Sequence, residues 1–111
     1  MANAFKNAQA VGVGTSEVSV YTTPSSTVAT VVGLSCANVT STSPIKVSVR
    51  VNDSSESTHA YVVKNAEIFE GGALVAVGGD QKLVLETGDI IKVISDTSNS
   101  VDVIVSIMEQ T

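Results

Sequence analysis

Alternation of apolar and polar residues is the clearest pattern in the chain. In Ile45–Val51 every second residue is aliphatic, and Lys46, Ser48 and Arg50 occupy the positions between them. A period of two places the aliphatic side chains on one face of a β-strand and the polar side chains on the other. The stretch Val101–Ile107 has the same period, with valine or isoleucine at every odd position. Both stretches are therefore predicted to be strands with one face in the core.

The stretch Leu83–Val93 predicts two buried strands joined by a tight turn. Two apolar runs, Leu83–Leu85 and Ile90–Val93, flank the four residues Glu86-Thr87-Gly88-Asp89. Glycine accepts positive φ without steric cost, and an aspartate side chain can bond nearby backbone groups. We interpret the stretch as a β-hairpin.

The longest apolar run, Thr27–Val39, has aliphatic residues at both odd and even positions. Two interpretations remain open. The run is either a central strand that is covered on both faces, or a strand interrupted by a bulge at Gly33.

These patterns together predict an all-β fold. About eight short strands follow one another at intervals of roughly 8–12 residues, as in antiparallel sandwiches. Their connections are too short for parallel crossovers. We expect one antiparallel β-sandwich, jelly-roll or immunoglobulin-like, over residues 11–111 of the 111-residue chain. The strands are expected within Val11–Gly14, Glu17–Thr22, Thr27–Val39, Ile45–Val51, Thr58–Lys64, Ala73–Val77, Leu83–Val93 and Val101–Ile107.

The first ten residues differ from the rest because they are rich in Ala and Asn and contain no β-branched residue. We predict an N-terminal arm over residues 1–10, either loose or docked on a neighbouring subunit. Phe5 would be its apolar anchor. The candidate interface residues are Phe5 and Lys6 of the arm and the two tyrosines, Tyr21 and Tyr61.

Composition and charge narrow the function classes. Six Lys and Arg stand against eleven Asp and Glu, giving a net charge of −5 and a pI near 4.5. Affinity for nucleic acid comes mainly from Lys and Arg at phosphates, so we expect no nucleic-acid partner. The same acidity disfavours anionic membranes, and no apolar run approaches the ~18 residues of a membrane span. With no signal-peptide core at the N-terminus, we expect use in, or assembly from, a reducing cytosol.

Candidate catalytic or metal-ligating residues are few. His59 is the single histidine, and no nearby serine lies in a nucleophile motif. Cys36 lies in the most apolar run, where a thiol usually behaves as a small hydrophobic group. Asp80, Glu86 and Asp89 could offer oxygens to a cation, but turn chemistry explains each of them. We therefore predict no catalytic residue, no metal and no cofactor.

Four segments resemble a group of small virion proteins of tailed bacteriophages, with support from the opening Met1–Lys6 and the last strand up to Glu109. The four segments are Val63–Ala66, Gly72–Val77, Gly79–Leu85 and Gly88–Val93. Such proteins are non-enzymatic and pack in many copies on the head, neck or tail. The resemblance therefore implies no catalytic or metal-binding residue.

The resemblance makes a capsid decoration (cement) protein the leading hypothesis. Such a protein would self-associate, with a trimer as our guess, and would bridge major capsid subunits on a virion assembled in the host cytoplasm. A neck, tail or fibre-attachment protein is the alternative of the same kind. An alternative of another class is a carbohydrate-binding sandwich, which would need exposed aromatic rings to stack on sugars.

Overall fold

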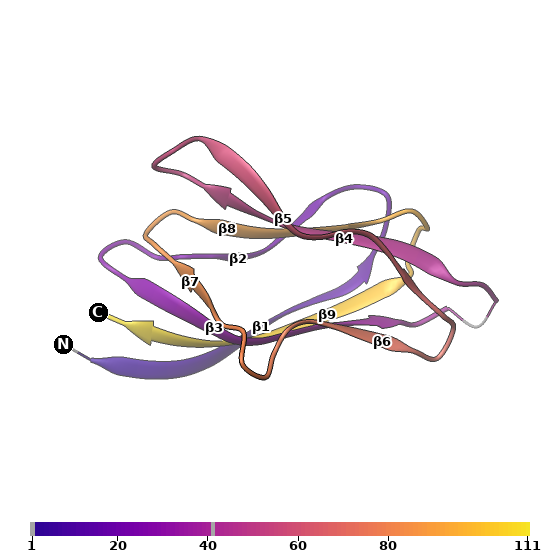
Figure 1. Cartoon of the computed structure of the whole chain (residues 1–111), viewed down its shortest axis with the longest axis horizontal. Coiled ribbons are helices and arrows are strands. Elements are labelled where there is room, and N and C mark those ends of the chain that lie inside the picture. Colours follow the sequence, from indigo (N-terminus) through magenta and orange to yellow (C-terminus); the bar gives the residue numbers. More distant parts are fainter. Residues whose placement is uncertain (1, 41) are drawn as a thin grey trace.

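The protein is a sandwich of two antiparallel sheets, in a computed structural model that describes residues 2–40 and 42–111. Figure 1 shows the two layers. The predicted all-β sandwich is thus confirmed, with nine strands in the described residues. None of those residues forms a helix that could cross a membrane. The strands are β1 (Asn3–Val13), β2 (Val18–Thr22), β3 (Val28–Asn38), β4 (Ile45–Asp53), β5 (Thr58–Ile68), β6 (Ala73–Val77), β7 (Leu83–Leu85), β8 (Ile90–Ser95) and β9 (Val101–Gln110).

Each sheet combines strands from both halves of the chain. The five-stranded sheet has the order β1-β9-β3-β6, and β7 also pairs with β3. The four-stranded sheet has the order β2-β8-β4-β5. In the first sheet β9 lies between β1 and β3, and it pairs with both over nearly its whole length. The last strand of the sequence is therefore central to the sheet.

The core lies between the two inner faces, where the alternating patterns predicted it. Ile45, Val47 and Val49 of β4 have no exposed surface, and the odd-numbered aliphatic residues of β9 are buried against them. Val, Ile and Leu supply most of this volume because the chain has no Trp and few aromatic rings. β-Branched side chains suit such a layer because they pack well on a pleated surface.

Strand β3 contains a bulge, which was one of the two interpretations of the run Thr27–Val39. The register with β9 shifts between Val31 and Gly33. Val31 is completely buried, whereas Val32 is partly exposed on the other side of the sheet. The second apolar face of β3 is therefore not covered by the residues that the structure describes, and its aliphatic residues point to the outside of the sandwich.

The stretch Leu83–Val93 forms a tight turn, but it is not a hairpin. The amide of Asp89 donates to the carbonyl of Glu86 at 2.9 Å, which closes the turn. The strands on either side then separate: β7 pairs with β3 in one sheet, and β8 pairs with β2 and β4 in the other. The hairpin prediction is wrong. A hairpin and a connection between two sheets both place buried apolar residues on each side of a turn, so the local pattern does not separate them.

The N-terminal segment is a strand, and the predicted arm outside the sheet is not what the structure shows. Residues Asn3–Ala10 pair with β9 in one unbroken register, and a bulge follows before Val13. Ala8 and Ala10 pack against the core while Asn7 and Gln9 face outward. Pairing with β9 determines the conformation here, since Ala and Asn have low intrinsic β-propensity. Met1 lies outside the described residues.

Candidate interaction surface

The side of the five-stranded sheet that points away from the core is the candidate functional surface, and we call it the outer face. Cross-strand pairing defines its rows. One row runs Phe5, Met108, Thr30 and Val84, and another runs Gln9, Ile104, Ser35 and Val75. Its large apolar side chains with exposed surface are Phe5, Val28, Val32, Val75, Val84 and Ile104.

The outer face is apolar and almost uncharged. Phe5 is 79% exposed, Val75 67% and Val84 63%. Among the strand residues that the pairing places on this face, Asp102 carries the one charge, and its Oδ1 accepts a hydrogen bond from the Gly12 amide at 2.9 Å. Contiguous exposed apolar patches of this kind mark interaction sites more often than single exposed side chains do.

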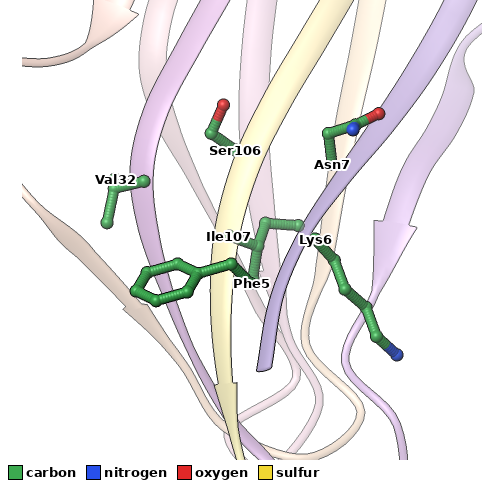
Figure 2. Close-up of a pocket in the computed structure, with 6 residues that line it drawn as sticks. All are labelled: Phe5, Lys6, Asn7, Val32, Ser106 and Ile107. Atoms are coloured by element: carbon green, nitrogen blue, oxygen red, sulfur yellow. The ribbon is translucent and has the colours of Figure 1, made fainter. Parts of the chain in front are cut away.

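A shallow hollow of about 290 Å³ lies on this face where β1, β9 and β3 run side by side. Figure 2 shows the ring of Phe5 extending across β9 toward Val32, with Asn7 and Ser106 further along the strands. Lys6 is also among the lining residues, and its amino group points to the other side of β1. The hollow offers a flat aromatic ring, an aliphatic side chain and two neutral hydrogen-bonding groups. It can therefore accept a complementary apolar side chain, and it contains no base or nucleophile pair.

Two of the predicted interface residues, Lys6 and Tyr21, bind the same buried carboxylate, that of Glu109. The Tyr21 hydroxyl donates to Glu109 Oε2 at 2.5 Å, and Lys6 Nζ lies 2.9 Å from Glu109 Oε1. Glu109 is buried on the inner side of β9. The cluster links β1 and β9 of one sheet to β2 of the other. Its position suggests a role in joining the sheets at this end of the sandwich.

The cluster also shifts two pKa values. The hydrogen bond from Tyr21, followed by that from Lys6, holds the pKa of Glu109 below its ordinary value. Burial, reinforced by the neighbouring Glu109 carboxylate, raises the pKa of Tyr21 above its ordinary value. At neutral pH the group is thus an ionised carboxylate with two hydrogen-bond donors, which is a stable arrangement for a buried charge.

The other two predicted interface residues lie apart from each other. Phe5 is part of the outer face, whereas Tyr61 lies on β5 in the other sheet. Tyr61 is 49% exposed, and Lys64 Nζ lies 5.1 Å from its ring centroid. The structure thus does not gather the four candidates into one surface. It also provides no pair of neighbouring exposed rings from Phe5 and Tyr61 for stacking on a sugar.

The single histidine belongs to a polar network on the four-stranded sheet. Arg50 binds Glu17 through two hydrogen bonds of 2.6 and 2.7 Å, and its Nη1 lies 2.7 Å from His59 Nδ1. Asn52 Oδ1 lies 2.5 Å from the same nitrogen. The Arg50 hydrogen bond lowers the pKa of Glu17. The partners of His59 are an arginine and an amide, which is typical of a surface network and offers no nucleophile for the imidazole to activate.

The acidic side chains near the sheet-crossing turn form a different set from the predicted one. Asp53, Glu86 and Asp89 place carboxylate oxygens within 4.8 Å of one another, and Asp80 is not among them. Asp89 accepts from the backbone amides of Ser54 and Glu86. Because backbone donors already bind its carboxylate, turn geometry accounts for the position of Asp89.

Cys36 is completely buried on the inner side of β3. Burial raises the pKa of its thiol to about 11, so that the reactive thiolate is scarce at neutral pH.

The outer-face residues Val75, Val84 and Ile104 were not predicted as candidates. Their signal was present in the sequence, since each lies in a run that has apolar residues on both faces. Such runs are typical of strands that are covered on both sides. Within one chain the second covering layer is missing, so the same pattern produces an exposed apolar face.

Comparison with known proteins shows a shared fold. Neither a protein-family model nor a curated protein sequence matches the chain. Among solved structures, the chain is similar to one from the Bacillus endospore appendages, which are described as a novel family of disulfide-linked pili. The TM-score is 0.57 over 99% of this chain and 87% of that chain, at 11% sequence identity. At this identity the likeness shows the β-sandwich architecture alone.

Proposed function

We propose that this chain is a non-enzymatic structural subunit that assembles with copies of itself through the outer face of its five-stranded sheet. The observation that carries the proposal is the contrast between this face and the rest of the molecule. The chain has a net charge of −5, yet the face is apolar, and its described strand residues include one charged side chain, Asp102. Two copies can therefore approach through it without opposing their acidic groups.

The size of the face suits such an interface. Strands of 10 or 11 residues, such as β1, β3 and β9, are ~36 Å long. Four strands at ~4.8 Å spacing make the sheet ~19 Å wide, so the face covers ~700 Å². Standard stable interfaces bury roughly 800 Å² on each partner. One sheet face can therefore supply nearly the whole of an ordinary interface.

The similar fold supports a structural role without defining the assembly. The solved chain belongs to appendages described as disulfide-linked pili. The one cysteine of this sequence, Cys36, has no exposed surface and cannot reach another copy while the sandwich is closed. The assembly that we propose for this chain is therefore held by burial of apolar surface and by hydrogen bonds.

At a finer level we propose that the assembly is part of a tailed-phage particle. The leading role is a decoration protein on the head lattice, and the alternative is a neck, tail or fibre-attachment protein. This finer proposal depends on the sequence resemblance alone. Quantitative mass spectrometry of purified particles would test it, because a lattice-wide protein has hundreds of copies and a neck ring has a small fixed number. Absence of the chain from the particles would refute it.

The self-association is tested with a charge placed on the outer face. Val75→Glu and Val84→Glu each put a carboxylate among exposed valine and isoleucine side chains, and they should weaken association at least tenfold in sedimentation over a concentration series. Thr22→Glu, at an exposed position of the other sheet, is the matched control. Since all three positions are exposed, the thermal midpoint should change little. Equal association by the three variants, or a wild-type chain that remains monomeric, would contradict the proposal.

A further inference from the structure

We propose that β1 is a docking edge for a second copy of this chain, and that the two β1 strands pair antiparallel around a twofold axis at Asn7. The two five-stranded sheets would then join into one. This inference rests on the proposed self-association and specifies one contact within it. An interface in which the same strand faces itself is isologous and closes as a dimer.

The free side of β1 presents unpaired backbone groups. Ala2 and Thr111 exchange two backbone hydrogen bonds of 3.2 and 2.9 Å, so they form a hydrogen-bonded pair. The register continues without a shift to Ala10, and bonded pairs alternate along an antiparallel ladder. The even-numbered residues therefore bond to β9. The N–H and C=O groups of Asn3, Phe5, Asn7 and Gln9 point away from the sheet, where the described structure pairs β1 with no strand other than β9.

The edge of β1 combines length with regular pairing, unlike the other sheet edges. Strand β5 has irregular pairing with β4 and carries Lys64 and Glu67. Strands β2 and β6 have five residues each and β7 has three. Exposed edges of natural sheets are usually short, bulged or charged, which prevents pairing with other chains. In contrast, β1 pairs regularly over Asn3–Ala10, and the charge of its lysine, Lys6, is held in an ion pair with Glu109.

The sequence of β1 selects the register. The residues whose N–H and C=O groups point to the free edge must face one another, so the twofold axis lies on a residue and not between two. Within Asn3–Ala10, an axis at Phe5, Lys6, Asn7 or Ala8 pairs at least five residues of each strand. An axis at Lys6 would place two lysines ~4.5 Å apart between Cα atoms, which like charges disfavour. An axis at Asn7 sets Lys6 opposite Ala8 and Phe5 opposite Gln9. It also pairs Ala4–Ala10, a longer stretch of the regular strand than an axis at Phe5 or Ala8 allows.

The neutral edge of β1 favours a second copy of this chain as the partner. The outward-pointing residues of β1 from Asn3 to Gln9 are neutral, so no charge is present to select a basic or acidic partner. Figure 2 shows Phe5 and Asn7 on β1 beside the outer-face hollow, with Lys6 turned away. Joining two such edges extends the outer face across both copies. The contact therefore enlarges the same apolar surface that carries the proposed assembly.

A cysteine at the twofold axis tests the register. In a hydrogen-bonded antiparallel pair the Cα atoms are ~5.5 Å apart, within the ~4.4–6.8 Å that a disulfide spans. Asn7→Cys should therefore form a covalent dimer under mild oxidation at low protein concentration. Gln9→Cys is the matched control, because the two Cα atoms at this position in the dimer would lie ~14 Å apart, too far for a disulfide. An equal mixture of Gln9→Cys and Phe5→Cys should form the mixed dimer, and buried Cys36 should leave the wild-type chain uncrosslinked.

Asn7→Pro provides the second measurement. Asn7 donates no bond to β9, so proline there should preserve the fold while it removes an outward N–H. It should raise the dissociation constant of the dimer roughly tenfold or more. The inference is wrong if wild-type protein associates but Asn7→Cys cross-links no better than Gln9→Cys and Asn7→Pro associates normally. That outcome would not contradict assembly through the outer face. A monomeric wild-type chain would refute both proposals, and loss of association in Val75→Glu alone would locate the contact on the face and away from β1.

Discussion

At the residue scale, the side chain of Glu109 on β9 connects this strand to β1 and β2 through polar contacts. A carboxylate buried this deeply would be unfavourable without partners, and it has two. Tyr21 comes from β2 and Lys6 from β1, so one carboxylate connects both sheets through its two oxygens. The side chain of Lys6 is 56% exposed. Solvent therefore screens the ion pair, and the shorter contact from Tyr21 is expected to contribute more to stability.

The first prediction concerns this hydrogen bond. Tyr21→Phe should lower the free energy of unfolding by roughly 1–2 kcal/mol at pH 7, because a hydrogen bond to a charged group is lost. Glu109 has a lowered pKa in the folded protein, so its contribution is present above the unfolded value, ~4.3, and is lost as pH falls through the folded value. The difference between the variant and the wild type should therefore shrink in acid. Urea titrations from pH 7 to pH 3 measure it, and a pH-independent difference would contradict this account.

At the element scale, the turn between β7 and β8 decides which sheet each strand joins. Gly88 has a φ of +89°, and its amide donates to the Thr23 carbonyl at 3.0 Å. A Cβ atom there would lie 2.6 Å from Ser54 Oγ, which itself donates to the Thr87 carbonyl. Glycine is therefore required for both the backbone conformation and the close approach of the β4–β5 loop.

The second prediction separates those two requirements. Gly88→Ala should destabilise the fold by roughly 2–3 kcal/mol, which combines left-handed strain of about 1–2 kcal/mol with a displaced Ser54. Gly71→Ala is the control, since Gly71 has a φ of +74° and no atom within 4 Å of its Cβ position. It should show the strain alone, about 1–2 kcal/mol. Denaturant midpoints at constant m-value measure both variants. Equal losses would mean that the contact with Ser54 is unimportant.

The elements also show what the sequence could and could not predict. Burial of one face imposes a period of two, so the inner faces of β4 and β9 followed from alternation alone. The destination of a strand after a turn depends on contacts far along the chain, and local pattern cannot separate a hairpin from a crossover at Gly88. The Asn3–Ala10 part of β1 escaped prediction for a related reason: its pairing with β9, about a hundred residues away, overrides weak local propensity. Of the candidate surface, Phe5 alone was identified.

At the scale of the whole molecule, charge and apolar surface are segregated. The third prediction uses this arrangement. Copies with a net charge of −5 repel one another, and salt shortens the range of that repulsion from ~30 Å at 0.01 M to ~8 Å at 0.15 M. Self-association should therefore strengthen as NaCl is raised, and sedimentation velocity would record larger species. Weaker association at higher salt would instead indicate contacts between opposite charges.

The two described ends of the chain lie together at one corner of the sandwich, as Figure 1 shows. Ala2 and Thr111 are tied by their reciprocal backbone hydrogen bonds. A linker of a few residues could thus connect them without disturbing the strands. New ends could then be opened in the exposed loop Ser54–Ser57. Such a circular permutant would move a fused protein from the corner beside β1 to the β4–β5 loop of the four-stranded sheet. The β1 edge would then stay open to a partner strand.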